Sequence, residues 1–469
     1  MTTRRDFLLG ASTLAGAAIL SNATATAELT PLKITPRPGK AKLLGPEGGH
    51  TDIWGYDGLV PGPILRAKQG EEFAIDLVNQ LPQPTTIHWH GIRIKNAMDG
   101  VAGLTQPPVK AGDQFTYRFV PSDAGTYWYH PHNRTWEQLA RGLYGAFVVD
   151  EPKPPAVDQD VTLVIDDWRL DKDDKIHERS LGSMHDITHA GRLGNVITLN
   201  GQGTYDLATK AGERLRIRLI NAANARTVGV IFEGHAPIVV ALDGQPLKTP
   251  FAPQRNMIFL APSQRADIIL DCNQTPNSKT KITADTGREK LQMGQIVYHA
   301  SKRARPSILS DIPVLPPNPM PTTLDLDNSV SLDLIMTGGA MSWFETARYK
   351  GKTIGVRELV RKHGKAWAFN GIVGMPEQPL AKVDRGQTIK VRLVNQTAWP
   401  HAMHFHGHHF REIEHSRRAP LPYWRDTIFI QREEEITVAF NAHNPGKWML
   451  HCHMLGHQAG GMGTWYEVT

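Results

Sequence analysis

Cysteine is scarce in this chain. Cys272 and Cys452 are the only two among 469 residues, so at most one internal disulfide can form. Runs of one charge are also absent: 52 basic and 46 acidic residues leave a net charge of +6, spread along the whole chain. Without a basic run of more than a few residues, the sequence predicts no nucleic-acid partner. Long helical periods are few, which argues against a mainly helical fold.

Near the N-terminus, the apolar stretch that ends at Leu20 is too short and too rich in Ala and Gly for a spanning helix. It follows a twin-arginine pattern in residues 3–9, and residues 25–27 (Ala-Thr-Ala) form a small-residue cleavage site. Residues 1–27 are therefore predicted to be a signal peptide read by the Tat export machinery, which carries folded proteins to the bacterial periplasm. No membrane contact is expected after cleavage; an uncleaved anchor is the alternative.

Glycine and proline are plentiful, at 42 and 33 residues, and 40% of the chain is hydrophobic. Short alternating segments are separated by Gly, Pro, Asn and Asp, a pattern typical of all-β sandwiches or barrels. Residues 68–79, 210–221 and 384–395 repeat one unit, in which nine positions separate a turn glycine from an asparagine. Pro-rich segments at 151–155 and 305–321 lie between the copies. We predict domains at 28–150, 159–302 and 323–469, and a helix at 353–363 in a surface flap.

The repeat aligns four His-x-His pairs. His88 stands nine residues after Asn79, and His404 stands nine after Asn395, whereas the second copy has Val230 at that position. A further pair follows a glycine by five residues in the first and third domains. The four pairs are His88 and His90, His130 and His132, His404 and His406, and His451 and His453. Eight imidazoles are the number needed to bind three metal ions, two of them with three histidines each and one with two.

Cys452 lies between His451 and His453. Because alternate residues of a strand face opposite ways, the thiol is predicted to point away from both imidazoles and to serve a second site. A thiolate, two imidazoles and a weak thioether are the ligands of an electron-transfer copper. His457, Met462 and His401 complete that set. The first-domain counterparts are Thr85, Pro131, Trp136 and Arg141, so only the third domain is predicted to hold such a site.

Buried polar histidines without metal are the competing interpretation, but ten histidines stand at ligand positions. The remaining ones, such as His185 and His189, are predicted to be solvated. His408, His409 and His443 are candidates for positions beside the metal ligands. Cys272 follows an apolar run and is predicted to be structural.

These motifs resemble those of three-domain multicopper oxidases of the bacterial laccase-like group. The resemblance implies three consecutive cupredoxin-like Greek-key β-barrel domains and four copper ions. It implies a type 1 copper bound by His401, Cys452, His457 and Met462. It further implies a type 2 copper at His88 and His404, and a type 3 pair at His90, His130, His132, His406, His451 and His453.

The resemblance also suggests catalytic carboxylates. Asp99 matches a family residue that helps to supply protons, although Asp-Gly is also a common turn. Gln458 stands where bacterial relatives often carry a glutamate, so proton delivery is expected to differ. Asp426 resembles a family carboxylate near the type 1 edge, where it would orient His401 or accept a phenolic proton; a plain turn aspartate is the alternative.

The implied activity is laccase-like: phenolic donors give single electrons, and dioxygen takes four and becomes water. The expected partners are thus dioxygen and a small phenolic or metal-ion donor. The alternative is a metallo-oxidase for Cu(I), Mn(II) or Fe(II), although Met336 and Met341 are interpreted as packing residues and not as a methionine-rich segment. A copper-free cell-envelope scaffold is a third hypothesis, and it would require missing ligands.

Overall fold

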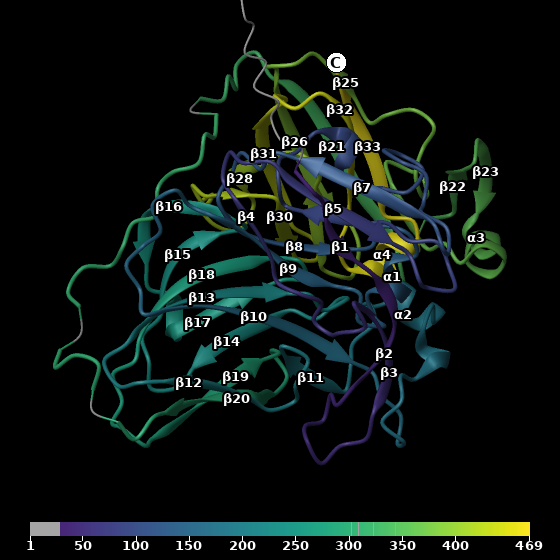
Figure 1. Cartoon of the computed structure of the whole chain (residues 1–469). Coiled ribbons are helices and arrows are strands. Elements are labelled where there is room, and N and C mark those ends of the chain that lie inside the picture. The colour runs from purple at the N-terminus through teal and green to yellow at the C-terminus, as the bar shows by residue number, and fades with distance from the viewer. Residues whose placement is uncertain (1–28, 302, 308, 322, 343) are drawn as a thin grey trace, which may run out of the picture. The chain divides into compact units, whose positions relative to one another are not determined.

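The computed structural model describes residues 29–469 except 302, 308, 322 and 343; the predicted signal peptide, residues 1–27, lies outside the described part. Strands dominate, so the predicted all-β class is confirmed (Figure 1). Pro31–Thr469 forms one compact unit. Within the described residues, no helix is both long and apolar enough to cross a bilayer.

The first group of strands folds into a three-stranded sheet, β1-β5-β7, a four-stranded sheet, β4-β9-β8-β6, and the pair β2-β3. The elements are β1 (Leu32–Ile34), β2 (Pro36–Ala41), β3 (Thr51–Tyr56), β4 (Leu65–Lys68), β5 (Phe73–Val78), β6 (His88–His90), η1 (Asn96–Met98), β7 (Gln114–Phe119), β8 (Gly125–His130), α1 (Thr135–Gln138) and β9 (Gly145–Asp150).

The second group forms a six-stranded sheet, β11-β10-β13-β18-β15-β16, and a five-stranded sheet, β12-β20-β19-β14-β17. The elements are β10 (Gln159–Trp168), η2 (Glu178–Ser180), α2 (Met184–Thr188), β11 (Val196–Leu199), β12 (Tyr205–Thr209), β13 (Arg214–Asn221), β14 (Val228–Phe232), β15 (Ile238–Leu242), β16 (Gln245–Phe251), η3 (Gln254–Asn256), β17 (Met257–Leu260), β18 (Arg265–Asp271), β19 (Lys279–Asp285) and β20 (Lys290–Tyr298).

The third group forms a six-stranded sheet, β24-β21-β26-β31-β28-β29, a five-stranded sheet, β25-β33-β32-β27-β30, and the pair β22-β23. The elements are β21 (Val330–Gly338), β22 (Thr346–Tyr349), β23 (Lys352–Gly355), α3 (Val356–His363), β24 (Trp367–Phe369), β25 (Lys382–Val383), β26 (Thr388–Asn395), β27 (His401–Phe405), β28 (Phe410–His415), β29 (Trp424–Arg425), β30 (Thr427–Ile430), β31 (Glu435–Asn441), β32 (Gly446–Cys452), α4 (Leu455–Ala459) and β33 (Gly463–Val468).

The repeated segments become β5, β13 and β26, and each has the same neighbours. One neighbour is parallel (β1, β10 or β21) and the other antiparallel (β7, β18 or β31). The asparagine after nine residues is buried in all three copies. Its amide donates to two backbone carbonyls, and its side-chain oxygen accepts a bond from the amide two residues on. Each asparagine therefore fixes the loop that leads into the next strand.

That next strand lies in the second sheet of each group. In the first and third groups, β6 and β27 carry the histidines and pair with β8 and β32, respectively. Strands β9 and β4 then continue the first of these sheets, as β33 and β25 continue the other. The two sheets therefore place their His-x-His pairs at equivalent positions.

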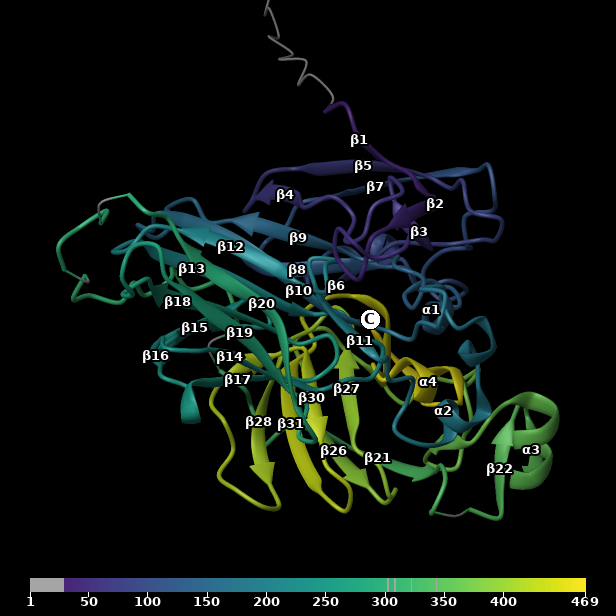
Figure 2. The same cartoon turned by 90° about the horizontal axis from the view of Figure 1, so that it is seen from below.

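Three apolar clusters fill the three groups, and a fourth, around Trp128 and Trp168, joins the first group to the second. Helices α2 and α4 lie side by side at the boundary between the second and third groups (Figures 1 and 2). The helix predicted at 353–363 begins later, at Val356, because residues 352–355 pair with β22 as β23. It ends at His363, where Gly364 takes the left-handed conformation with a φ of 63°.

Candidate metal centres

Equivalent strands from the first and third domains bring the eight predicted imidazoles together. His88 lies opposite His130 in the β6–β8 pair, just as His404 lies opposite His451 in the β27–β32 pair. All eight histidines are at most 6% exposed. They form three ligand groups, and each draws on both domains: His88, His90 and His404; His90, His130 and His453; and His132, His406 and His451.

Nitrogens converge within these groups. The Nε2 atom of His451 lies 3.2 Å from that of His406 and 3.4 Å from that of His132, and those of His130 and His453 are 3.3 Å apart. Nitrogens arranged tetrahedrally about 2 Å from one metal ion would be ~3.3 Å from each other. The spacing therefore fits two ions with three histidines each.

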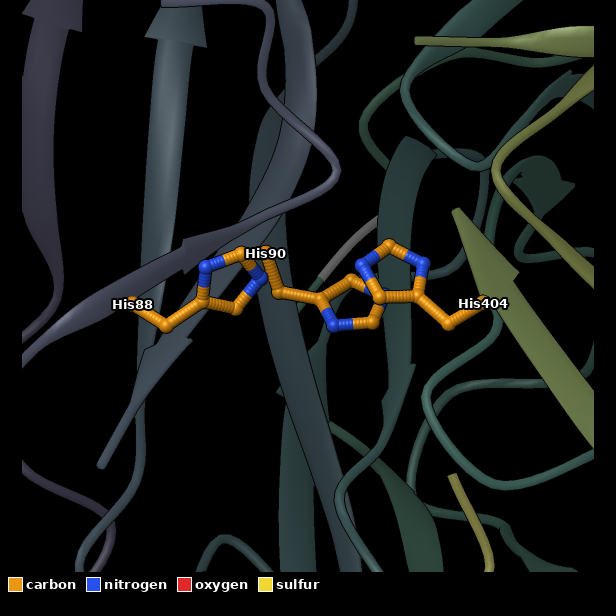
Figure 3. A group of neighbouring side chains, drawn as sticks. All are labelled: His88, His90 and His404. Carbon is orange, nitrogen blue, oxygen red and sulfur yellow. The ribbon is translucent and has the colours of Figure 1, made fainter. Parts of the chain in front are cut away.

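His88 comes from the first domain and His404 from the third, and the ring of His90 is seen between them in Figure 3. Each Nδ1 donates to a backbone carbonyl, at 2.8 Å to Asp99 and 3.0 Å to Asp426, which leaves each Nε2 with a free lone pair. Both Nε2 atoms are buried and have no hydrogen-bond partner among the described residues. Because such buried atoms are rarely left unpaired, the pair fits a third ion.

Burial keeps these imidazoles neutral. It is the main cause that lowers the pKa of His451, to about 3, and the neighbouring His404 lowers that pKa further. Burial, and after it the charge of neighbouring histidines, also lowers the pKa values of His90, His132 and His406. Neutral imidazoles can bind a metal ion without first losing a proton.

The thiol of Cys452 points to a separate group, formed with His401 and His457. Its Sγ lies 3.7 Å from the Nδ1 of each imidazole, and the two Nδ1 atoms are 3.0 Å apart. Both Nε2 atoms are hydrogen-bonded, that of His401 to the Thr397 hydroxyl and that of His457 to the His189 carbonyl, at 2.9 and 2.6 Å. Burial raises the pKa of the thiol to about 12, so a thiolate here needs a cation beside it.

Met462 lies next to this group. Its backbone carbonyl accepts a hydrogen bond from the Cys452 amide at 3.2 Å. Its side chain is fully buried in the apolar cluster that also contains Cys452. Trp367, which the sequence did not single out, packs against both imidazoles, with ring centroids 4.5 Å from His457 and 5.2 Å from His401. Cys272 is a free, buried thiol in the core of the second domain, in keeping with a structural role.

Asp99 lies against the histidine cluster, at the end of η1. Its Oδ2 accepts a bond from His406 Nδ1 at 2.9 Å, and its Oδ1 lies 3.3 Å from His88 Nδ1. The carboxylate therefore joins a histidine of the first domain to one of the third. Its part in proton supply remains a prediction.

Asp426 is not near the type 1 edge, so that prediction is wrong. The β27–β30 register pairs His401 with Ile430 and His404 with Thr427, which puts Asp426 at the His404 end of the strand. Its Oδ1 lies 3.3 Å from His90 Nε2. Nor is it a plain turn residue: it is fully buried, and Arg265 donates to both of its oxygens, at 2.9 and 2.5 Å.

Arg265 is a residue that the sequence did not reveal. It comes from the second domain, which holds none of the predicted ligands, so the histidine repeat gave no signal for it. Burial raises the pKa of the Asp426 carboxyl, but the charge of Arg265 and the hydrogen bonds from His404, His90 and Arg265 together hold that pKa well below its usual value. The second domain thus places a fixed ion pair beside the metal cluster.

The other candidate histidines differ in position. His409 is buried with its Nε2 3.6 Å from Asp426 Oδ2, whereas His408 bonds to the Tyr466 hydroxyl and His443 to Arg93. His185 is exposed, as predicted, but His189 is half-buried; its ring packs against Trp399, and its carbonyl accepts the hydrogen bond from His457. Met336 is a core residue, whereas Met341 is 83% exposed and does not pack.

A cavity of about 430 Å³ reaches the cluster at His132 and is also lined by Gln458, Glu377, Lys447 and Trp465. A second, of about 200 Å³, lies between α2 and α3 and is lined by Thr188, Gly339, Phe344, Val360 and Ala366 among others.

Three family models, each described as multicopper oxidase, match residues 40–154, 159–299 and 353–469. The predicted fold of three cupredoxin-like domains is thereby confirmed. Multicopper oxidase MmcO of Mycobacterium tuberculosis is 29% identical over 92% of this chain and 85% of its own length. The crystal structure of a multi-copper oxidase from Pseudomonas thermotolerans matches with a TM-score of 0.80 at 30% identity, over 94% of this chain and 99% of that one. Lac15, from a marine microbial metagenome, matches with a TM-score of 0.74 at 38% identity, over 94% and 100% of the two chains.

Proposed function

Because the chain belongs to the multicopper oxidase family, and is therefore a copper-dependent oxidoreductase that uses dioxygen, we propose that its donors are small phenols. Four one-electron oxidations of such a donor would supply the four electrons that reduce one dioxygen to two waters. The donor class and the roles of individual residues belong to this proposal.

The observation that carries the oxidase activity is the segment His451-Cys452-His453 at the end of β32. Cys452 joins the group with His401 and His457, while its two neighbours join two different histidine groups. Copper supplies the chemistry, because it takes up and releases single electrons at accessible potentials. The chain's part is to hold the electron-accepting site within one residue of the dioxygen-reducing cluster, so that electrons have a short covalent route.

The residues around the cluster orient its histidines and are proposed to supply its protons. Hydrogen bonds from His88 and His404 to backbone carbonyls fix the ring orientation. Asp99 is proposed to pass protons to the cluster, and its contacts with histidines from both domains support this role. Gln458 cannot act as a carboxylic acid, so the remaining protons are proposed to enter with water through the cavity that Gln458 lines with His132.

The cavity between α2 and α3 supports a phenolic donor. At about 200 Å³, with an aromatic and several aliphatic lining residues, it suits a single substituted ring. Ala366 in its wall precedes Trp367, which packs against His457, and Thr188 precedes His189, whose carbonyl accepts the His457 hydrogen bond. A donor bound there would be close to the thiolate site without entering the histidine cluster.

The cellular location is proposed from the N-terminal sequence. The twin-arginine pattern in residues 3–9 and the small residues at 25–27 support export through the Tat machinery and cleavage near residue 27. The periplasm is then the compartment in which the enzyme would meet its donor. Export of a fusion carrying residues 1–27 should stop when both arginines are replaced by lysine.

Donor choice can be tested on copper-loaded protein under air. Wild type should oxidise a methoxyphenol with four electrons per dioxygen. Val360→Phe, which fills the cavity, should raise the KM for this phenol by about tenfold, whereas Arg361→Ala on the exposed side of α3 should not. Full copper content without any phenol oxidation would reject the phenolic donor and leave the family assignment intact.

The metallo-oxidase alternative also has a structural observation in its favour: the exposed ring of His185 stacks on that of the half-buried His189, whose carbonyl accepts the hydrogen bond from His457.

A further inference from the structure

A third cavity, of about 580 Å³, lies between the second and third domains. The second domain lines it from β15, β16 and β17, and the third from β28, β29, β30 and the loop at 416–423. It shares no lining residue with the cavity at His132 or with the one between α2 and α3, and none of its lining residues is a predicted metal ligand. Its volume is typical of sites that bind small molecules.

Aromatic side chains form the apolar part of its wall. Phe259 on β17 contacts Phe429 on β30, with ring centroids 5.5 Å apart. Phe251 and Tyr423 lie nearly parallel, also 5.5 Å apart, with an angle of 13° between their planes. Phe259 is 46% exposed and Leu421 is 39% exposed. Exposed apolar side chains that gather in one cavity mark a binding surface, and flat rings suit an aromatic ligand.

Most of the charged residues in this wall are already neutralised. Arg418 donates to both oxygens of Glu412, at 2.7 and 3.0 Å, and Arg425 donates to Asp243 at 2.6 Å. His415 adds no positive charge near pH 7, because burial and then the charge of Arg418 lower its pKa. These groups therefore leave no net charge for a ligand to balance.

Arg417 is the exception. Its Nη2 donates to the backbone carbonyls of Arg432 and Glu433, at 2.6 and 3.1 Å, whereas its Nε and Nη1 make no hydrogen bond with the residues that the structure describes. The Glu434 carboxylate lies 3.9 Å from Nε and accepts the Gln431 amide at 2.7 Å. The Arg417 side chain is 48% exposed. A guanidinium with free N–H groups is well suited to bind a carboxylate.

We propose that this cavity binds an aromatic monocarboxylate, with its ring system against the aromatic side chains and its carboxylate on Arg417. A volume of about 580 Å³ favours two fused rings over the single ring assigned to the cavity of about 200 Å³. Both domains supply the wall, so the bound ligand contacts both of them. Binding involves no electron transfer and does not depend on which donor the enzyme oxidises.

The probe is 2-naphthoate, which can be titrated into the copper-loaded protein by calorimetry. Wild type should bind one molecule. Arg417→Gln should weaken the affinity at least about tenfold, because a hydrogen bond to a charged group is lost, and Phe259→Ala should weaken it by a similar factor, because apolar contact area is lost. Arg288→Gln is the matched control: it removes an exposed arginine from the turn between β19 and β20 and should bind as wild type does.

The neutral isostere 2-naphthamide tests the carboxylate itself. It should bind to wild type at least about tenfold more weakly than 2-naphthoate, and equally to wild type and Arg417→Gln. No binding of 2-naphthoate to wild type, or equal affinity in wild type, Arg417→Gln and Phe259→Ala, would overturn the inference.

Competition with the phenolic donor separates the two cavities. Because they share no lining residue, 2-naphthoate should leave the KM for a methoxyphenol unchanged. A KM that rises in proportion to the 2-naphthoate concentration would place the ligand in the cavity between α2 and α3 and overturn the proposal. Binding that depends on Arg417, in a wild type that oxidises no methoxyphenol, would uphold this site and reject only the phenolic donor.

Discussion

The first and third domains build matching halves of one histidine cluster, yet only the third has a thiolate site. His130 and His132 flank Pro131, whereas His451 and His453 flank Cys452. Pro131 has no side-chain ligand, and Thr85, the counterpart of His401, hydrogen-bonds to Gln138 instead. The same fold can therefore contribute histidines to the cluster from both domains and accept electrons in only one of them. The residues at the positions of Cys452 and His401 determine which domain accepts electrons.

Two aspartates extend this comparison. Asp99 lies near His88 and Asp426 near His404, and the backbone carbonyl of each accepts the Nδ1–H of its histidine. Asp426 is bound by Arg265, whereas the Asp99 carboxylate lies beside two histidines, His406 and His88. Asp426 is therefore suited to supply a permanent negative charge, and Asp99 to exchange protons.

Removing the thiol should have the largest effect. Cys452→Ser should abolish the intense red-region absorption band and lower kcat at least about 10³-fold, because electrons lose their entry site. Absorption spectra, copper content and turnover would check this. Pro131→Ala, the equivalent position in the first domain, should leave the band unchanged; loss of the band in both variants would contradict the proposed asymmetry.

Breaking the buried ion pair should reduce stability. Asp426→Asn removes the buried carboxylate to which Arg265 donates twice and leaves it only Asp243, at 3.4 Å, as a buried countercharge among the described residues, which should cost about 3 kcal/mol and lower the midpoint of thermal unfolding. Asp333→Asn is the matched control, because it breaks an ion pair with Arg392 that is about half exposed and should cost less than about 1 kcal/mol. Equal decreases of the unfolding midpoint in the two variants would show that the buried ion pair stabilises the fold no more than the exposed one does.

Asp99→Asn should affect the reaction more than the fold. Without the carboxylate, reoxidation by dioxygen should slow about 10- to 100-fold, while the red band and its reduction by a phenol persist. Stopped-flow measurements would separate reduction from reoxidation. If reoxidation proceeds at the wild-type rate, Asp99 has no part in proton delivery.

The smallest effect concerns pH. Burial, then the charge of Arg93, lowers the pKa of His443 to about 4, below the usual value of about 6.5. As pH falls below 6.5, the unfolded chain takes up this proton first, so stability is lost between pH 6.5 and 4, at up to about 1.4 kcal/mol per pH unit. His443→Asn should flatten the decline of the unfolding midpoint across that range; an unchanged slope would argue against a neutral His443.

The sequence predicted the fold class and brought the correct histidines together because both are periodic. Because the repeat has a fixed register, it places His88 and His404 on equivalent strands even when the rest of the tertiary structure is unknown. Asp426 was misplaced because a carboxylate alone in a turn has no register; its position depends on which residue of β27 pairs with Thr427. Arg265 was missed for a related reason, since its partner lies 161 residues away in another domain.

The metal ions also have a topological consequence. The two Nε2 pairs that span the domains join residues 319 and 323 positions apart, so each bound ion closes a loop that contains the whole second domain. The metal ions must therefore be removed before the first and third domains can separate. A cross-link restricts the unfolded chain most when the loop that it closes is long. Copper retention should therefore report on completed folding as well as on catalysis. A chain that holds its full complement has necessarily brought its first and last domains together.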